Sequence, residues 1–286
     1  STPLLSIAPG AARAAEWPSA GPIRLVVASG AGGNADVVAR LVADQLEDAI
    51  GQTIVVENLS ASSGMQGTQA VSEAEANGYT LLVGTSSQLV HNIALFEPLP
   101  VDITNTLRGV AMMNEVPMVM LVGNDEDSTD LEAFIAKLRA DPDAYQYGSG
   151  PAGTTTHITG ALFLSRLGLD ITHEPYPKSG EALRDTIAGR LTFQFIPALS
   201  GVPQIRDGAV RSLGVAAPER LAALPDVPTI GEAGLDGFVS QTWNSIAAPT
   251  GTPDAIVARL NEEVNRIVQS DAVKSRLIDL GSLVPA

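Results

Sequence analysis

The sequence predicts an α/β fold of two Rossmann-like lobes with a ligand cleft between them, and three observations support this. The length of 286 residues exceeds one typical domain of about 100–200 residues and suits two lobes or one large α/β domain. Hydrophobic residues make up 45% of the chain and aromatic residues only 4%, so we expect cores of Ala, Val, Leu and Ile. Short β-branched runs also alternate with amphipathic helical patterns, in two successive series.

The first series begins with a strand at 23–29, followed by the turn GAGGN and a helical pattern that Gly51 ends. A strand at 53–58 leads through SASSGMQG into a helix that ends near Gly78, and YTLLVGTSS is the third strand. This order predicts a parallel sheet with right-handed crossovers, in which ligands bind at the carboxyl ends of the strands. Three loops should converge there: 29–34, 60–64 and 84–88.

The α/β scheme starts again in the second half of the chain. Its expected elements are, in order, a strand at 117–123, a helix at 131–140, a strand at 145–148, a helix ending at Gly168, a strand at 171–176, a helix from Gly180 and the strand TFQFIP. Strands at 212–216 and 243–248 precede a last amphipathic helix that Thr252-Pro253 opens, and 224–234 is an ordered irregular connection. Because the last helix should pack back on the first lobe, we assign residues 22–117 plus 230–286 to lobe 1 and 118–229 to lobe 2.

Charge and cysteine content exclude several classes of protein. Acidic residues outnumber basic ones 32 to 17, and the formal net charge of -15 makes nucleic acid and anionic lipid poor partners. The absence of cysteine excludes disulfides, thiolate nucleophiles and Cys-based metal sites.

Residues 1–16 are interpreted as a signal-peptide remnant or a disordered tail. The run STPLLSIAPGAARAA is apolar and contains an A-x-A-like site at Ala12-Arg13-Ala14, although the charged n-region is absent. No later run approaches 18 apolar residues, so the mature protein should not span a membrane. We therefore expect an exported protein.

The loop Gly30-Ala31-Gly32-Gly33-Asn34-Ala35 fits the pattern G-x-G-x-x-A between a strand and a helix, and Glu57 follows about 20 residues later. This is the dinucleotide fingerprint, in which N–H groups and a helix N-terminus approach a pyrophosphate and the acid binds ribose. The same geometry serves any anion, so the loop could instead cradle another ligand or be a structural turn. Asp36 could cap the helix, fix the shape of the loop or accept a hydrogen bond from the ligand.

A second loop rich in glycine and hydroxyl groups, Ser149–His157, lies between a strand and a helix of the second series. Two helix N-termini that face each other across a cleft can hold a dianion with N–H and O–H donors alone, without any Arg or Lys. A simple helix cap would use the same residues. The third loop, Gly84–Ser87, is also rich in donors and has the same two interpretations.

No motif for catalysis accompanies these loops. His91, His157 and His173 lack metal-ligand spacing, and no H-E-x-x-H, Asp-rich metal loop or P-loop occurs. The serines at the strand ends lack the G-x-S-x-G frame of a nucleophile elbow. We therefore predict a binding protein that is no enzyme and needs no cofactor, with an oxidoreductase that binds NAD or NADP as the alternative.

Several segments resemble a known family in their order along the chain: WPSAGPIRLVVASGAGGNADVVARLVADQL, IVVEN, NGYTLLVGTSS, YGSGPAGTTTH, ALRDTIAGRLTFQF, LPDVPTIGEAG and TWNSIAAPTGTP. From Trp17 to its C-terminus the chain resembles the substrate-binding proteins of tripartite tricarboxylate transporters, the Bug or TctC-like type. The resemblance implies a periplasmic solute-binding protein of the type II architecture. Its lobes would close on a dicarboxylate, tricarboxylate, aromatic carboxylate or amino acid and then dock on a membrane permease.

The resemblance also implies a set of ligand-binding residues on the strand-to-helix loops of both lobes. Carried over by position, they are Ser29, Gly30, Ala31, Gly32, Gly33, Asn34, Asp36, Thr85, Ser86, Ser149, Gly150, Gly153, Thr154, Thr155, Thr156, His157, Phe195, Ile196, Pro197 and Ala198. The chain departs from the family pattern where Ala28–Ala31 and Asn34-Ala35 replace a Pro-rich approach and a Ser-Thr pair. Leu59–Gly64 lacks the usual Arg and Pro, and Ile196 stands where an acid often occurs. These departures leave the ligand open and point to a less polar or aromatic acid.

Overall fold

The structure is a computed structural model that describes residues 17–285, so the segment interpreted as a signal-peptide remnant or tail lies outside the described residues. Nine strands form one mixed sheet in the order β2-β1-β3-β9-β4-β7-β5-β6, and β8 pairs with β4 beside this path. The strands are β1 (Ile23–Val27), β2 (Ile54–Asn58), β3 (Thr80–Thr85), β4 (Leu107–Val122), β5 (Gln146–Ser149), β6 (Thr172–Pro175), β7 (Phe193–Pro197), β8 (Arg211–Ala216) and β9 (Gln241–Pro249).

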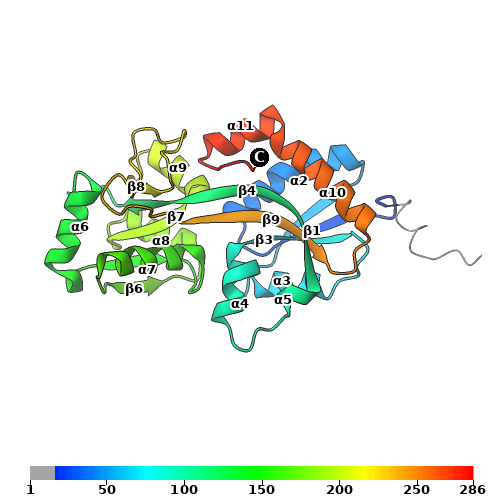
Figure 1. The fold of residues 1–286 in the computed structure, drawn as a ribbon, viewed down its shortest axis with the longest axis horizontal. Helices are drawn as coiled ribbons and strands as arrows, with labels where there is room; N and C mark the ends of the chain where they lie inside the picture. Colours follow the sequence, from blue (N-terminus) through cyan, green and yellow to red (C-terminus); the bar gives the residue numbers. More distant parts are fainter. Residues whose placement is uncertain (1–16, 286) are drawn as a thin grey trace, which may run out of the picture.

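Helices cover both faces of this sheet (Figure 1). They are α2 (Asn34–Ile50), α3 (Met65–Ser72), the π-helix η1 (Ser87–His91), α4 (Asn92–Leu95), α5 (Ile103–Thr106), α6 (Leu131–Ala140), the 3₁₀ turn η2 (Pro142–Ala144), α7 (Thr155–Leu167), α8 (Ser179–Ile187), α9 (Ala198–Arg206), α10 (Asp254–Gln269) and α11 (Asp271–Asp279). Between residues 17 and 285, none of the helices combines the length and the apolar character that crossing a membrane requires.

The predicted parallel strands are present in both halves of the chain. β1 pairs in parallel with β2 and β3, and β5 pairs in parallel with β6 and β7. The carboxyl ends of each parallel group therefore lie at one edge, and the loops that follow these strands converge as expected. We call β1, β2 and β3 with their β9 and β4 neighbours sheet region 1, and β5 to β8 with the end of β4 sheet region 2.

Two long antiparallel strands join the sheet regions, and Figure 1 shows them running side by side through the middle of the molecule. β4 pairs with β9 from Leu107 to Pro117, and from Met118 onward it pairs with β7 and β8. The sequence predicted this strand only from residue 117. Its first part escaped detection because Gly109, Asn114 and two shifts of register interrupt the alternation of apolar residues.

Three other elements differ from the sequence-based expectation. α3 ends at Ser72 and not near Gly78, because residues 73–79 form turns. α9 was not predicted, since Pro203 lies inside it and a proline normally argues against a helix interior. The last amphipathic helix that was predicted after Thr252-Pro253 is present as α10, but a second helix that was not predicted, α11, follows it after Ser270, whose backbone is extended.

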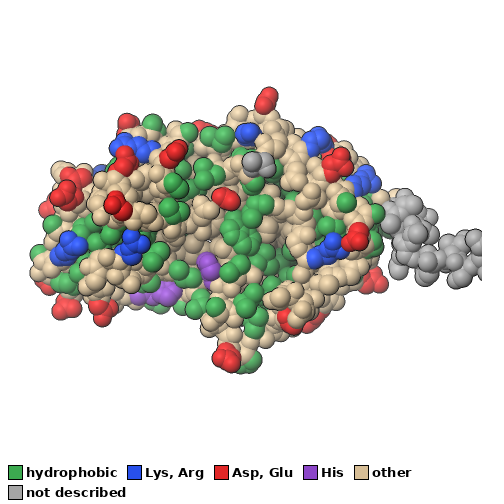
Figure 2. Space-filling view, viewed as in Figure 1, with side chains coloured by type: hydrophobic (Ala, Val, Ile, Leu, Met, Phe, Trp, Pro, Cys, Tyr) green, Lys and Arg blue, Asp and Glu red, His purple; other side chains and the backbone are tan. Residues whose placement is uncertain are grey.

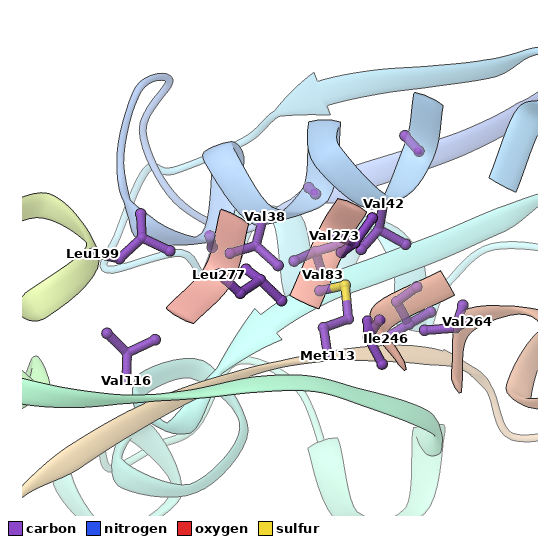
Figure 3. Close-up of a cluster of buried hydrophobic side chains, with 14 of the residues drawn as sticks. Val38, Val42, Val83, Met113, Val116, Leu199, Ile246, Val264, Val273 and Leu277 are labelled. Carbon is purple, nitrogen blue, oxygen red and sulfur yellow. The ribbon is translucent and has the colours of Figure 1, made fainter. Parts of the chain in front are cut away.

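The largest hydrophobic cluster packs α2, α10 and α11 against the strands that they cover. Figure 3 shows Val38 and Val42 of α2 close to Val273 and Leu277 of α11, above Met113 and Ile246 of the two long strands. A second cluster in sheet region 2 differs from the expected Ala, Val, Leu and Ile core. It contains five of the six phenylalanines of the chain, all buried, at 134, 163, 193, 195 and 238.

Candidate functional site

A cavity of about 650 Å³ lies where the strand-to-helix loops of both sheet regions converge. The N-cap residues of five helices line it: Gly33 of α2, Gly64 of α3, Thr154 of α7, Lys178 of α8 and Pro197 of α9. None of these five helices has a hydrogen bond from its first turn to the N-cap side chain. Because the first N–H groups of a helix lack intrahelical partners and carry partial positive charge, the cavity is suited to an anion.

The charged side chains of the cavity have one sign. Among the described residues that line it, only Lys178 and Arg276 are charged, and no carboxylate is present. Arg276 lies 3.6 Å from Asp279, whereas Lys178 forms no ion pair with any residue from 17 to 285. The sequence predicts that the N–H and O–H donors of the loops can hold a dianion without Arg or Lys. The structure shows that Lys178 and Arg276 also line the cavity.

Asp36 fixes the shape of the first loop from behind. Its carboxylate accepts hydrogen bonds from the Gly32 N–H at 2.8 Å, from Arg40 Nε at 3.0 Å and from Asn58 Nδ2 at 3.0 Å. Burial raises the pKa of Asp36, but the bonds from Arg40, Gly32 and Asn58 outweigh burial and hold that pKa below its usual value. Asp36 is only 3% exposed and does not line the cavity. Of the three roles given for it in the sequence analysis, which are capping the helix, fixing the shape of the loop and contacting the ligand, its contacts match the second.

The second loop is held by its own polar groups. The Gly150 N–H donates to Thr156 Oγ1 at 3.0 Å, and the Gly153 N–H donates to His157 Nδ1 at 3.2 Å. The His157 ring stacks on His173 with centroids 4.2 Å apart, and Ser149 Oγ lies 2.7 Å from His173 Nε2. These bonds give the loop one defined shape.

Both stacked histidines are neutral near pH 7. Burial lowers the pKa of His157, while burial and the neighbouring His157 lower the pKa of His173 to about 4. They therefore act as rigid hydrogen-bonding groups behind the loop and add no positive charge to the site.

A buried group of hydroxyls joins the third loop to the second across the floor of the cavity. Ser86 Oγ lies 3.1 Å from Thr155 Oγ1 and 3.0 Å from Thr242 Oγ1. The Thr155 N–H, at the start of α7, donates to Ser87 Oγ at 3.2 Å. Loops that belong to different sheet regions thus contact each other directly.

The structure brings twelve of the predicted site residues to the cavity wall: Ser29, Gly30, Ala31, Gly32, Gly33, Asn34, Thr85, Thr154, Thr155, Thr156, Ile196 and Pro197. The other eight lie behind this wall: Asp36, Ser86, Ser149, Gly150, Gly153, His157, Phe195 and Ala198. Most of these eight are buried or hydrogen-bonded within the loops, and Phe195 belongs to the aromatic cluster. The ligand contacts of all twenty stay a prediction.

Several lining residues were missed by sequence reasoning. Lys178, Ser179 and Gly180 could have been found, because they lie between a strand and a helix, as the other loops do. Thr242 lies on β9, and Arg276 lies in α11 without any local motif. Only the tertiary structure brings these two residues to the cavity.

The dinucleotide interpretation requires a free acid beside the glycine loop, and Glu57 does not supply it. Its carboxylate accepts a hydrogen bond from Arg24 Nε at 2.6 Å, which lowers the pKa of Glu57, and it does not line the cavity. Within residues 17–285, no group of three or more His, Asp or Glu side chains is arranged to hold a metal ion.

Comparison with known proteins identifies the family. Residues 38–284 match the tripartite tricarboxylate transporter family receptor, TctC. The protein BugT of Bordetella pertussis is 34% identical over 253 residues, which cover 88% of this chain and 78% of BugT.

Two solved structures from Rhodopseudomonas palustris share the whole architecture. MatC with bound malate is 33% identical, has a TM-score of 0.86, and is matched over 93% of this chain and 90% of its own. Rpa4515 with adipate is 31% identical, has a TM-score of 0.90, and is matched over 94% of this chain and 89% of its own.

These matches confirm the type II periplasmic-binding-protein fold, and they confirm a solute receptor and not an enzyme, because the family consists of periplasmic transport receptors. The resemblance carried by the segments from Trp17 onward is confirmed as well. The chain belongs to the TctC, or Bug, family of tripartite tricarboxylate transporter receptors.

Proposed function

We propose that this protein captures a small organic carboxylate in the cavity and presents it to the membrane permease of a tripartite transporter. The observation that carries the proposal is the cavity itself, which is lined by five helix N-termini and by two cations, with no carboxylate among the described residues of its wall. Two relatives of the same architecture bind malate and adipate.

The carboxylate is expected to accept hydrogen bonds from both sides of the cavity. First-turn N–H groups of α2 and the loop 29–34 serve one side, and first-turn N–H groups of α7 serve the other. The hydroxyls of Thr154 and Thr156 are hydrogen-bonded within their own loop and hold it in shape. Lys178 supplies a positive charge that forms no ion pair with any residue in the described part of the chain. Asp36, Ser149 and the remaining predicted residues support this set by holding the loops in place.

The remaining wall favours a ligand with an apolar body. Leu183, Ile196, Leu199, Pro203 and Leu280 line the cavity, and Ile196 is the position where the resemblance given in the sequence analysis implies an acid. Burying apolar surface of a ligand against an apolar wall contributes about 25 cal/mol per Å² to the free energy of binding. We therefore expect adipate or an aromatic acid to bind more tightly than malate.

Closure of the cavity would need two bodies that hinge about the long strands. We place the bodies at residues 22–117 plus 230–286 and at 118–229. The change of pairing partners between Pro117 and Met118 supports the first boundary. Ile230 and Phe238 pack in the cluster of sheet region 2, which favours a return crossing at the start of β9 instead of at residue 230. Export by a signal peptide within residues 1–16 and docking of the closed form on the permease complete the proposal.

Isothermal titration with adipate, malate, citrate, benzoate and the neutral analogue adipamide tests the proposal. We expect a carboxylate to bind and adipamide to bind at least tenfold more weakly. Lys178→Ala should weaken adipate binding roughly 3- to 10-fold, the effect of one partly screened ion pair. Lys274→Ala is the matched control, because Lys274 contacts Gln269 and does not line the cavity. The absence of binding to every carboxylate would refute the function.

A further inference from the structure

Two serines in the loop before α3 have a backbone conformation that residues with a side chain rarely adopt. φ is +52° at Ser62 and +55° at Ser63, and Gly64 follows with φ of +86°. In this left-handed region a Cβ lies too close to the following carbonyl oxygen, so glycine is strongly favoured there. Each serine therefore carries backbone strain that a glycine at the same position would avoid.

Buried amides of the neighbouring helices hold the loop in this conformation. The Ser63 carbonyl accepts hydrogen bonds from Gln88 Nε2 at 3.2 Å and from Asn92 Nδ2 at 3.3 Å. The orientation of the Gln88 amide is determined, because its Oε1 accepts from the backbone N–H of Thr85 at 3.0 Å and its Nε2 faces a backbone carbonyl. Strain of this kind persists where the surrounding structure imposes it, and it occurs preferentially at functional sites.

The two strained serines differ in their relation to the cavity. Ser63 is partly buried and lines the cavity, whereas Ser62 is exposed and does not line it. Among residues 17–285, no hydrogen-bond partner is found for the Ser63 N–H or for its Oγ, although its carbonyl has two. An O–H donor beside an N–H donor is suited to an oxygen of a carboxylate, with which hydrogen bonds are stronger than between neutral groups.

We propose that Ser63 contacts the ligand and that its hydroxyl donates a hydrogen bond to an oxygen of the bound acid. The fold holds position 63 in a conformation that suits glycine, and the serine supplies there a donor that glycine lacks. The strain is thus the cost of placing a hydroxyl in the cavity wall. This inference rests on the proposed function and deepens it, because it adds a binding residue from the loop before α3.

The test compares substitutions at the two serines, which share the backbone conformation and differ in whether they line the cavity. Ser63→Ala removes the hydroxyl but keeps the Cβ, and it should weaken adipate binding roughly five- to tenfold in titration calorimetry, because a hydrogen bond to a charged group is lost. Ser62→Ala is the matched control and should stay within about twofold of the wild type. Equal adipate affinity of the wild type and Ser63→Ala would overturn the inference and leave the proposed function in place.

Glycine at each position separates the strain from the contact with the ligand. Ser62→Gly and Ser63→Gly both relieve the left-handed conformation, so neither should lower the melting temperature. Only Ser63→Gly should weaken adipate binding, to the same extent as Ser63→Ala. A melting temperature that falls in Ser63→Gly, or wild-type affinity in this variant, would contradict the inference. If the wild type binds no carboxylate at all, the proposed function fails and the inference fails with it.

Discussion

Removing the Asp36 carboxylate should destabilise the protein and loosen the first loop. In Asp36→Ala the Gly32 N–H loses its acceptor, and a hydrogen bond to a charged group contributes about 1.5–3 kcal/mol. Asn58 keeps its bond to the Ser29 carbonyl, and Arg40 is half-exposed and can be hydrated, so these partners add little. We expect a loss of about 2–3 kcal/mol in the free energy of unfolding.

Urea unfolding followed by tryptophan fluorescence measures this loss, and titration calorimetry measures adipate binding in the same variant. Asp44→Ala is the matched control, since Asp44 lies on the same helix and is exposed. Asp36→Asn should have an intermediate effect, because its side-chain oxygen can still accept from Gly32 but carries no charge. The reasoning is refuted if Asp36→Ala and Asp44→Ala unfold within about 0.5 kcal/mol of each other.

The remaining predictions concern the aromatic cluster, the histidines and the loop before α3. Phe163→Ala should cost about 3–5 kcal/mol in urea unfolding, whereas Phe96→Ala, at a side chain 38% exposed, should stay within about 0.5 kcal/mol; similar losses would contradict the packing argument. The pKa of His173 is depressed from 6.5 to about 4, and that of His157 is also lowered, so the unfolded chain binds more protons in this range. Stability should be full above pH 6.5 and decline as the pH falls toward 4, and a melting temperature that is constant over this window would refute this. Gly64→Ala should lower stability by roughly 1–3 kcal/mol and weaken carboxylate binding, because φ is +86° and a Cβ would lie 2.2 Å from a backbone oxygen at the end of β1; unchanged values would show that the loop can relax.

The elements with strong local patterns were predicted well. The helix after the glycine loop runs from Asn34 to Ile50 as expected, because its apolar stripe and its Gly51 stop are both local signals. The first part of β4 and the helix α9 were missed, since tertiary pairing of Asn114 and packing around Pro203 override local preference. The aromatic cluster was missed because an average over the whole chain conceals residues that gather in sheet region 2.

The candidate site was predictable to the extent that topology determines it. Once two parallel groups of strands were recognised, their loops had to converge, and the glycines and hydroxyls of these loops marked the cavity. Arg276 and Thr242 were out of reach, because they come from elements more than 200 residues after the first loop. The role of Asp36 was also left open, because a carboxylate in a first helical turn has several possible partners.

The positive charge of Lys178 and Arg276 in the cavity wall affects the rate at which an anion binds. On the face in Figure 2, acidic groups are spread around the outer surface while the middle is mostly neutral and hydrophobic. An anion that approaches a molecule of charge -15 is repelled at long range and attracted close to the cavity, where Lys178, Arg276 and the helix N-termini lie. At 0.1 M salt the Debye length is about 10 Å, so charges farther from the anion than this are largely screened. Added salt therefore weakens the long-range repulsion more than the short-range attraction inside the cavity. Moderate ionic strength should therefore accelerate the capture of an anion, the reverse of electrostatic steering between opposite charges.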